Sequence, residues 1–182
     1  MSNLDLDICY LSASEALEKF KNKSLSPVEL LTETIKRIED VNPKINAFNF
    51  FRFEDALEEA KNSESKYSKG EVSLPLEGIP LAIKDEVNIT GQPNKNGSLI
   101  FKDVIAESTD VDVESLVNSG AILHARTTNP EFSLTSFCHS KVNGVTRNPW
   151  DLEMTPGGSS GGSAAALAAG CTTLATGSDI GG

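Results

Sequence analysis

The first third of the chain carries apolar residues at the three- and four-residue spacing of amphipathic helices. One such helix face is formed by Val28, Leu31, Ile35 and Ile38. Ser12 and Glu15 form a capping-box pattern, which is a start signal for a helix. Ser26, with Pro27 at the first helical position and Glu29 at the third, forms a stronger one. We therefore expect residues 1 to about 66 to be mainly helical.

The following segments alternate between strand and helix patterns. "KINAFNFF", residues 44–51, mixes alternation with aromatic side chains and predicts a strand, whereas "EDALEEAK", residues 54–61, predicts a helix. After a connection punctuated by Gly and Pro, the apolar residues 79–83 predict a short strand. "DVESLVNSGA" predicts a helix ended by Gly120, and residues 121–128 predict a buried strand. This alternation predicts an α/β layer structure over residues 76–182.

Composition narrows the class of protein. With 182 residues, 38% of them hydrophobic, the chain is long enough for one ordinary domain with a core. A net charge of -10 and a pI near 4.7 argue against binding to a nucleic-acid backbone, since such binding depends on clustered Lys and Arg. The N-terminal residues are acidic, and the apolar run 164–169 is far shorter than the ~20 residues of a membrane span. We expect a cytoplasmic protein without nucleic-acid or membrane partners.

The cysteines and histidines predict neither a disulfide framework nor a metal site. Cys9, Cys138 and Cys171 are odd in number and widely scattered, so we expect ordinary, partly buried residues. Cys138 lies beside His139, but neighbours in sequence usually point apart, which argues against a Cys–His catalytic pair. His124, in an apolar run, is expected to be a strand residue with a local partner. No metal and no cofactor are expected.

The most unusual stretch is "TPGGSSGGSAAALAAG", residues 155–170. Two glycine pairs flank Ser159 and Ser160, and an alanine-rich helix closed by Gly170 follows. A helix N-terminus beside such a loop suits an anion or a developing oxyanion. The stretch lacks the lysine of a P-loop and the spacing of a dinucleotide fingerprint. A flexible linker is the other alternative, but the helix and the strand-like "TTLATGSD", residues 172–179, argue against it.

A second candidate is Lys84, at the end of the apolar strand in "GIPLAIKDEV". A solvated lysine beside Asp85 is one interpretation. The other is a desolvated amine, because burial at a strand end favours the neutral form that can act as a base.

Taken together, these motifs resemble the amidase signature family, whose members hydrolyse carboxylic amides. The resemblance extends over most of the chain, through "GIPLAIKD", "NPEF", "NGVTRNPWD", the glycine–serine loop and "GSDIGG". It implies a mixed sheet flanked by helices, within a single domain that covers residues 1–182 and is incomplete because the chain stops early. It also implies a Ser-Ser-Lys triad, in which Lys84 is the base and Ser159 is the bridging serine. Ser159 would follow a cis peptide bond from Gly158, with Ser160 in a supporting role.

The resemblance assigns the end of the chain to the same site. The backbone N–H groups of Ile180, Gly181 and Gly182 would form the oxyanion hole, and Asp179 would brace this loop. The nucleophilic serine of the family directly follows this motif, at position 183. The resemblance therefore implies that residues 1–182 end one residue before the nucleophile and would be inactive alone.

Three functions remain open. We favour an amidase acting on small-molecule or peptide amides, because "KDEVNITGQPNKNGSLIFKD", residues 84–103, looks less like the second candidate. That candidate is the related A subunit of the tRNA-dependent amidotransferase, which releases ammonia from glutamine. The third is a non-catalytic fragment or binding module.

Overall fold

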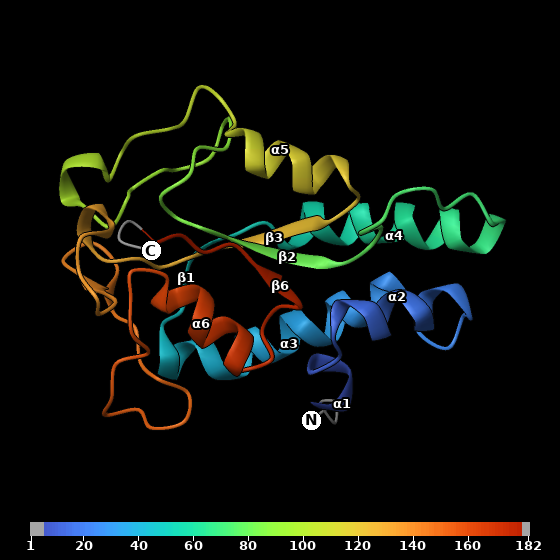
Figure 1. Cartoon of the computed structure of the whole chain (residues 1–182), viewed down its shortest axis with the longest axis horizontal. Coiled ribbons are helices and arrows are strands. Elements are labelled where there is room, and N and C mark those ends of the chain that lie inside the picture. Colours follow the sequence, from blue (N-terminus) through green and yellow to red (C-terminus); the bar gives the residue numbers. More distant parts are fainter. Residues whose placement is uncertain (1–5, 180–182) are drawn as a thin grey trace.

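A computed structural model of the chain describes residues 6–179 and places their helices around a four-stranded sheet (Figure 1). In chain order the elements are α1 (Leu6–Cys9), α2 (Ala13–Lys21), α3 (Pro27–Ile45), β1 (Phe48–Phe51), α4 (Phe53–Lys69), β2 (Pro80–Lys84), η1 (Leu99–Phe101), α5 (Val111–Asn118), β3 (Ile122–Thr127), η2 (Glu131–Ser133), β4 (His139–Ser140), β5 (Gly144–Val145), α6 (Gly161–Ala168) and β6 (Leu174–Ala175). The predicted mixed α/β fold is confirmed.

The sheet has the strand order β1-β3-β2-β6. β2 pairs in parallel with β3 and β6, and β1 pairs antiparallel to β3. The β2–β3 register shifts at His124, because Leu81 pairs with Leu123 and the next residue, Ala82, pairs with Ala125. A bulge of this kind turns the following side chains to the other face of the sheet. β4 and β5 form a separate two-stranded sheet.

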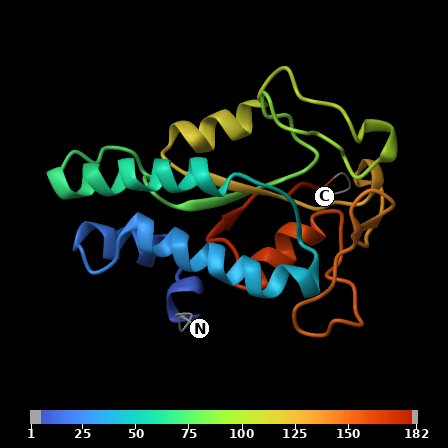
Figure 2. The ribbon, with the colours of Figure 1, turned by 180° about the vertical axis from the view of Figure 1, so that it is seen from behind.

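Helices cover both faces of the four-stranded sheet (Figures 1 and 2). On one face, Val113 of α5 packs against a cluster that includes Leu81, Ile83 and Leu123. On the other face, α3 and α6 pack against Ala82 and Ala125. The small side chains at this second contact let α6 lie close to the sheet. The N-terminus of α6 is thereby held at the carboxyl ends of β2 and β3, where Figure 1 also shows the loops after both strands.

Both predicted helix starts are present. In α2, Glu15 accepts a hydrogen bond from the Ser12 backbone N–H at 2.9 Å, and in α3, Glu29 accepts one from Ser26 at 2.8 Å. The serine hydroxyls accept from the glutamate backbone N–H groups in return. Local capping chemistry therefore sets where these helices begin.

The strand predicted for residues 44–51 is wrong in its first half. Helix α3 continues to Ile45 and ends at Asn46, which has a left-handed backbone with φ of 49°. The helix continues because Val41 and Ile45 extend its buried face, and tertiary burial outweighs the local alternation. The strand predicted for residues 172–179 is likewise shorter, since β6 contains only Leu174 and Ala175.

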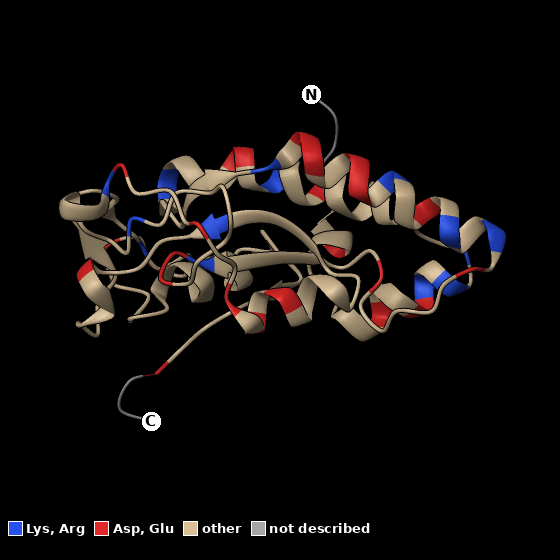
Figure 3. Cartoon of the chain, turned by 90° about the horizontal axis from the view of Figure 1, so that it is seen from above, with Lys and Arg blue, Asp and Glu red and all other residues tan. Residues whose placement is uncertain are grey.

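Acidic and basic positions are mixed along the helices in Figure 3, with no continuous basic stripe in that view. Among the residues that the structure describes, no helix has the length and apolarity needed to cross a membrane.

Candidate active site

Lys84 is the last residue of β2, and its side chain is only 1% exposed. Its backbone N–H donates to Thr176 Oγ1 at 2.9 Å, and the backbone N–H of Thr176 donates to Ala82 O at 3.0 Å. These two bonds tie the segment after β6 to the end of β2. Lys84 is therefore a buried lysine and not a solvated one.

Three oxygen atoms surround the Lys84 amine. Nζ lies 2.8 Å from Ser159 Oγ, 2.7 Å from Ser178 Oγ and 3.1 Å from Glu86 Oε2. A lysine ammonium has three N–H donors, so the three acceptors match its full donor capacity. A buried ammonium is stable only when it is paired and hydrogen-bonded in this way.

The glycine–serine loop brings Ser159 to the lysine. The Gly158–Ser159 peptide bond is cis, which is the geometry that the family resemblance implies. A Cβ atom on Gly158 would lie 2.9 Å from both the Phe137 nitrogen and the Thr135 oxygen, so the loop has room only for glycine there. The loop runs directly into the N-terminus of α6.

Two contacts fix that N-terminus against the end of β3. The Gly162 N–H donates to Thr128 O at 3.2 Å, and the hydroxyls of Thr127 and Ser163 lie 2.7 Å apart. A Cβ on Gly162 would come 2.5 Å from the Thr128 nitrogen. Glycine is therefore required for the close approach of helix and strand.

Ser160 joins the loop to the segment after β6. Its Oγ accepts from the Ser178 backbone N–H at 3.1 Å and donates to Ser178 O at 3.2 Å. Asp179 follows as an exposed residue. Ile180, Gly181 and Gly182, the predicted oxyanion-hole residues, lie outside the described residues.

Glu86 is ionised despite partial burial. Burial raises the pKa of its carboxyl group, but hydrogen bonds from Ser133, Ser178 and Lys84, together with the positive charge of Lys84, outweigh burial and lower the pKa below the usual value. The Ser133 hydroxyl donates to Glu86 Oε2 at 2.6 Å.

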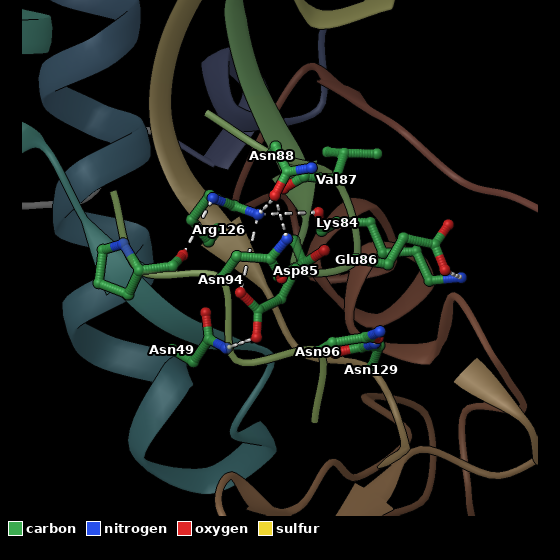
Figure 4. Close-up of polar contacts among 12 residues, drawn as sticks. Asn49, Lys84, Asp85, Glu86, Val87, Asn88, Asn94, Asn96, Arg126 and Asn129 are labelled. Atoms are coloured by element: carbon green, nitrogen blue, oxygen red, sulfur yellow. Dashed lines mark hydrogen bonds and ion pairs between the residues drawn. The ribbon is translucent and has the colours of Figure 1, made fainter. Parts of the chain in front are cut away.

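Asp85 points away from Lys84, as Figure 4 shows. Its Oδ1 lies 3.7 Å from the Arg126 guanidinium, and its Oδ2 accepts from Asn49 at 2.7 Å. Burial raises the pKa of Asp85, and the contacts with Arg126 and Asn49 oppose that shift. Arg126 is fully buried and also donates to the Val87 carbonyl. This pair braces the start of the loop after β2, and Glu86 is the carboxylate that contacts the lysine.

The other sequence candidates lie apart from this cluster. Cys138 is buried beside the hydroxyls of Thr128 and Thr146, whereas His139 is exposed and stacks on Phe137. All three cysteines are buried. His124 is a buried strand residue, as predicted, and its hydrogen-bond partner is the distant Thr172. Among residues 6–179, no three His, Cys, Asp or Glu side chains gather so that they could hold a metal ion.

A hollow of about 300 Å³ is lined by residues of the segments 137–147 and 153–155. Neither Lys84 nor Ser159 lines it. The lysine cluster, and not this hollow, is therefore the candidate site.

Sequence reasoning missed Ser178 and the role of Glu86 beside Lys84. Glu86 is only two residues from Lys84. Because a glutamate so close in sequence to a lysine is common on solvated surfaces, the sequence alone did not mark Glu86 as a site residue. Ser178 lies within "GSDIGG". In that motif the family resemblance assigned roles only to residues 179–182, so Ser178 was not identified as a site residue.

Comparisons with known proteins identify the family of this chain. A family model described as Amidase matches residues 29–182. The A subunit of the glutamyl-tRNA(Gln) amidotransferase of Methylacidiphilum infernorum is 42% identical over 172 residues, which cover 94% of this chain and 33% of that protein. Indoleacetamide hydrolase of Bradyrhizobium diazoefficiens is 39% identical over 171 residues, which cover 94% of this chain and 33% of that protein.

Solved structures give the same result. The crystal structure of a bacterial aryl acylamidase of the amidase signature family matches with a TM-score of 0.85 and 30% identity, covering 91% of this chain and 35% of that one. The chain belongs to the amidase signature family. It spans about a third (33% to 36%) of the length of the curated relatives that it matches.

Proposed function

We propose that the protein hydrolyses carboxylic amides with a Ser-Ser-Lys triad in which Lys84 is the base and Ser159 the proton relay. The observation that carries this proposal is the buried Lys84 amine, 2.8 Å from Ser159 Oγ. A serine hydroxyl is a weak nucleophile and needs a base, and an amide nitrogen must be protonated before it can leave. A neutral lysine that takes a proton through Ser159 and later returns it meets both needs.

The family resemblance supplies the remaining parts of the proposed mechanism. The nucleophile is the serine expected directly after Gly182, and its attack on the amide carbonyl gives a tetrahedral oxyanion. The backbone N–H groups of Ile180, Gly181 and Gly182 would donate to that oxyanion, and such donors are worth about 3 kcal/mol each in the transition state. Collapse releases the amine and leaves an acyl-enzyme, which water then hydrolyses. The substrate is a small-molecule or peptide amide.

A fluorophosphonate probe and an aryl amide test this proposal in the protein expressed from its complete reading frame. Labelling and hydrolysis should both fall by about 100-fold or more in Lys84→Ala and Ser159→Ala, because a general base and its relay contribute that much. Lys61→Ala, on the exposed surface of α4, is the matched control and should keep both activities. Residues 1–182 alone should not be labelled. Labelling of Ser159 itself, or full activity in Lys84→Ala, would contradict the proposed roles.

A second candidate is the glutamine amidase of a tRNA-dependent amidotransferase. It is favoured by the 42% identity to the A subunit of such an amidotransferase. The two functions differ in substrate, since this second enzyme would release ammonia from glutamine for partner proteins to use. Hydrolysis of glutamine that depends on added partner proteins, with no turnover of aryl or alkyl amides, would favour this candidate.

A further inference from the structure

The lysine cluster contains a carboxylate in addition to its two serines. Glu86 lies in the loop after β2, its side chain is 20% exposed, and its Oε2 is 3.1 Å from Lys84 Nζ. Figure 4 shows the side chains of Lys84 and Glu86 extending to the same side, while Asp85 extends to the other. The Ser178 hydroxyl, itself 2.7 Å from Nζ, also donates to Glu86.

A second loop holds Glu86 in place. Ser133 Oγ donates to Glu86 Oε2 at 2.6 Å and accepts from Asn129 Nδ2 at 3.0 Å. Phe132 and Ser133 have φ angles of 52° and 56°, in the left-handed region that residues other than glycine rarely adopt. Asn129 is 1% exposed. The chain of bonds from Asn129 through Ser133 to Glu86 therefore starts from a fixed, buried group.

We propose that Glu86 is a positioning residue for Lys84, which orients the amine toward Ser159 and stabilises the ammonium that forms when the amine accepts a proton. This inference rests on the amidase function proposed above. In the neutral amine, two N–H groups point at Glu86 and Ser178, so the lone pair faces Ser159. During attack the Ser159 O–H bond breaks and an N–H bond forms on Lys84. Ser159 takes the proton of the nucleophilic serine, and the negative charge passes to the oxyanion, while Glu86 keeps its own protonation state.

Other charges near the cluster have partners of their own or lie at its edge. The titratable side chains on the surrounding elements are Asp85 after β2, Lys95 in the following loop, Asp112 and Glu114 on α5, His124 and Arg126 on β3, Glu131 on η2, and Asp179 after β6. Asp85 lies against Arg126, and Glu131 accepts from Ser98 at 2.8 Å. The residues of α6 and β6 are not titratable, and Asp112 and Glu114 are exposed. Glu86 therefore supplies the ion pair that the structure records for Lys84.

This arrangement predicts two changes in Glu86→Gln. A carboxylate beside an amine stabilises the protonated form, so its removal should move the acidic limb of the kcat/KM profile to lower pH by about one unit or more. The ammonium is also stabilised less in the transition state, so kcat on the alkaline plateau should fall about threefold or more. A purely structural role for Glu86 would lower activity without moving the limb.

The experiment uses the protein expressed from its complete reading frame and an aryl amide. Glu58→Gln is the matched control, because it removes the same charge from the exposed face of α4, where the Glu58 side chain is 69% exposed. Glu86→Asp keeps the charge, so the acidic limb of its kcat/KM profile should lie close to that of the wild type. On the same samples, the ¹³Cε signal of Lys84 is titrated, and its midpoint should move to lower pH in Glu86→Gln only.

The outcomes separate this inference from the proposed function. If the protein hydrolyses amides and the profiles of Glu86→Gln and wild type coincide, the inference about Glu86 is overturned and the amidase function stands. If no variant hydrolyses any amide, the proposed function fails, and the Lys84 titration still decides whether Glu86 stabilises the ammonium. Should Glu86→Gln fail to fold, Glu86→Ala removes the same charge with a smaller side chain and carries the same expected shift.

Discussion

Acidification should destabilise the folded protein through one buried histidine. His124 is fully buried, and its Nε2 lies 2.9 Å from Thr172 Oγ1. The Thr172 hydroxyl donates to Leu174 O at 2.7 Å, so Nε2–H is the donor to Thr172 and Nδ1 carries the lone pair. Nδ1 has no hydrogen-bond partner among the described residues. A second proton would be placed there without an acceptor, and burial lowers the pKa of His124 to about 3.

The sign and size of the effect follow from this difference in pKa. The unfolded chain binds a proton on His124 below a pKa of about 6.5, whereas the folded chain does so only below about 3. Between these values the unfolded state holds more protons, so the free energy of unfolding falls as the pH falls. The limiting slope is about 1.4 kcal/mol per pH unit, which gives a loss of about 2 kcal/mol between pH 7.5 and pH 5.

Urea unfolding at about pH 7.5, 6.5, 5.5 and 5 measures this loss. His124→Gln keeps an N–H donor for Thr172 but does not titrate, so the wild type should lose about 2 kcal/mol more than this variant over that range. His139→Gln, which changes the exposed histidine, is the control and should follow the wild type. Equal pH dependence in the wild type and His124→Gln would refute the reasoning.

Three further substitutions test packing and pairing by urea or thermal unfolding. Gly162→Ala should cost about 2 kcal/mol or more, because its Cβ would lie 2.5 Å from the Thr128 nitrogen, and unchanged stability would contradict the close approach. Asp85→Asn should cost about 3–5 kcal/mol, since it removes the carboxylate that is ion-paired with the buried Arg126, and a neutral result would show that the remaining partners suffice for Arg126. Ser26→Ala should cost about 1 kcal/mol through loss of the α3 cap, and no change would mean that the cap contributes nothing.

The sequence predicted the helices well because their signals are local. Ser26 and Glu29 lie within one turn, and the apolar face of α3 repeats at fixed spacing, so neither depends on the rest of the fold. At residues 44–51 the prediction placed the start of the strand too early, because α3 continues to Ile45 and β1 begins at Phe48. Ile45 satisfies both a strand pattern and the last turn of the helix, and only its buried contacts with α6 and the sheet decide between them.

The site was predictable only where a sequence motif carries it. Lys84 and Ser159 stand in local patterns that marked them as candidates, and the family resemblance supplied their roles. Ser178 and Glu86 could not be placed beside the amine, since that position depends on the pairing of β2 with β6 and on the bond from Lys84 N–H to Thr176. Such long-range contacts leave no periodic trace in the sequence.

The contacts of Ser159 and Ser160 argue for different roles of these two neighbours. The Ser160 hydroxyl is occupied by the backbone of Ser178, from which it accepts one bond and to which it donates another. The Ser160 hydroxyl can exchange these hydrogen bonds only if the segment after β6 moves away from it. The Ser159 hydroxyl has the Lys84 amine as its partner at 2.8 Å, and Ser159 is half-buried. A proton relay must exchange donor and acceptor roles during each cycle, and only a hydroxyl without such backbone bonds can do so. The division of contacts therefore favours Ser159 as the relay and Ser160 as the residue that holds the two segments of the site together.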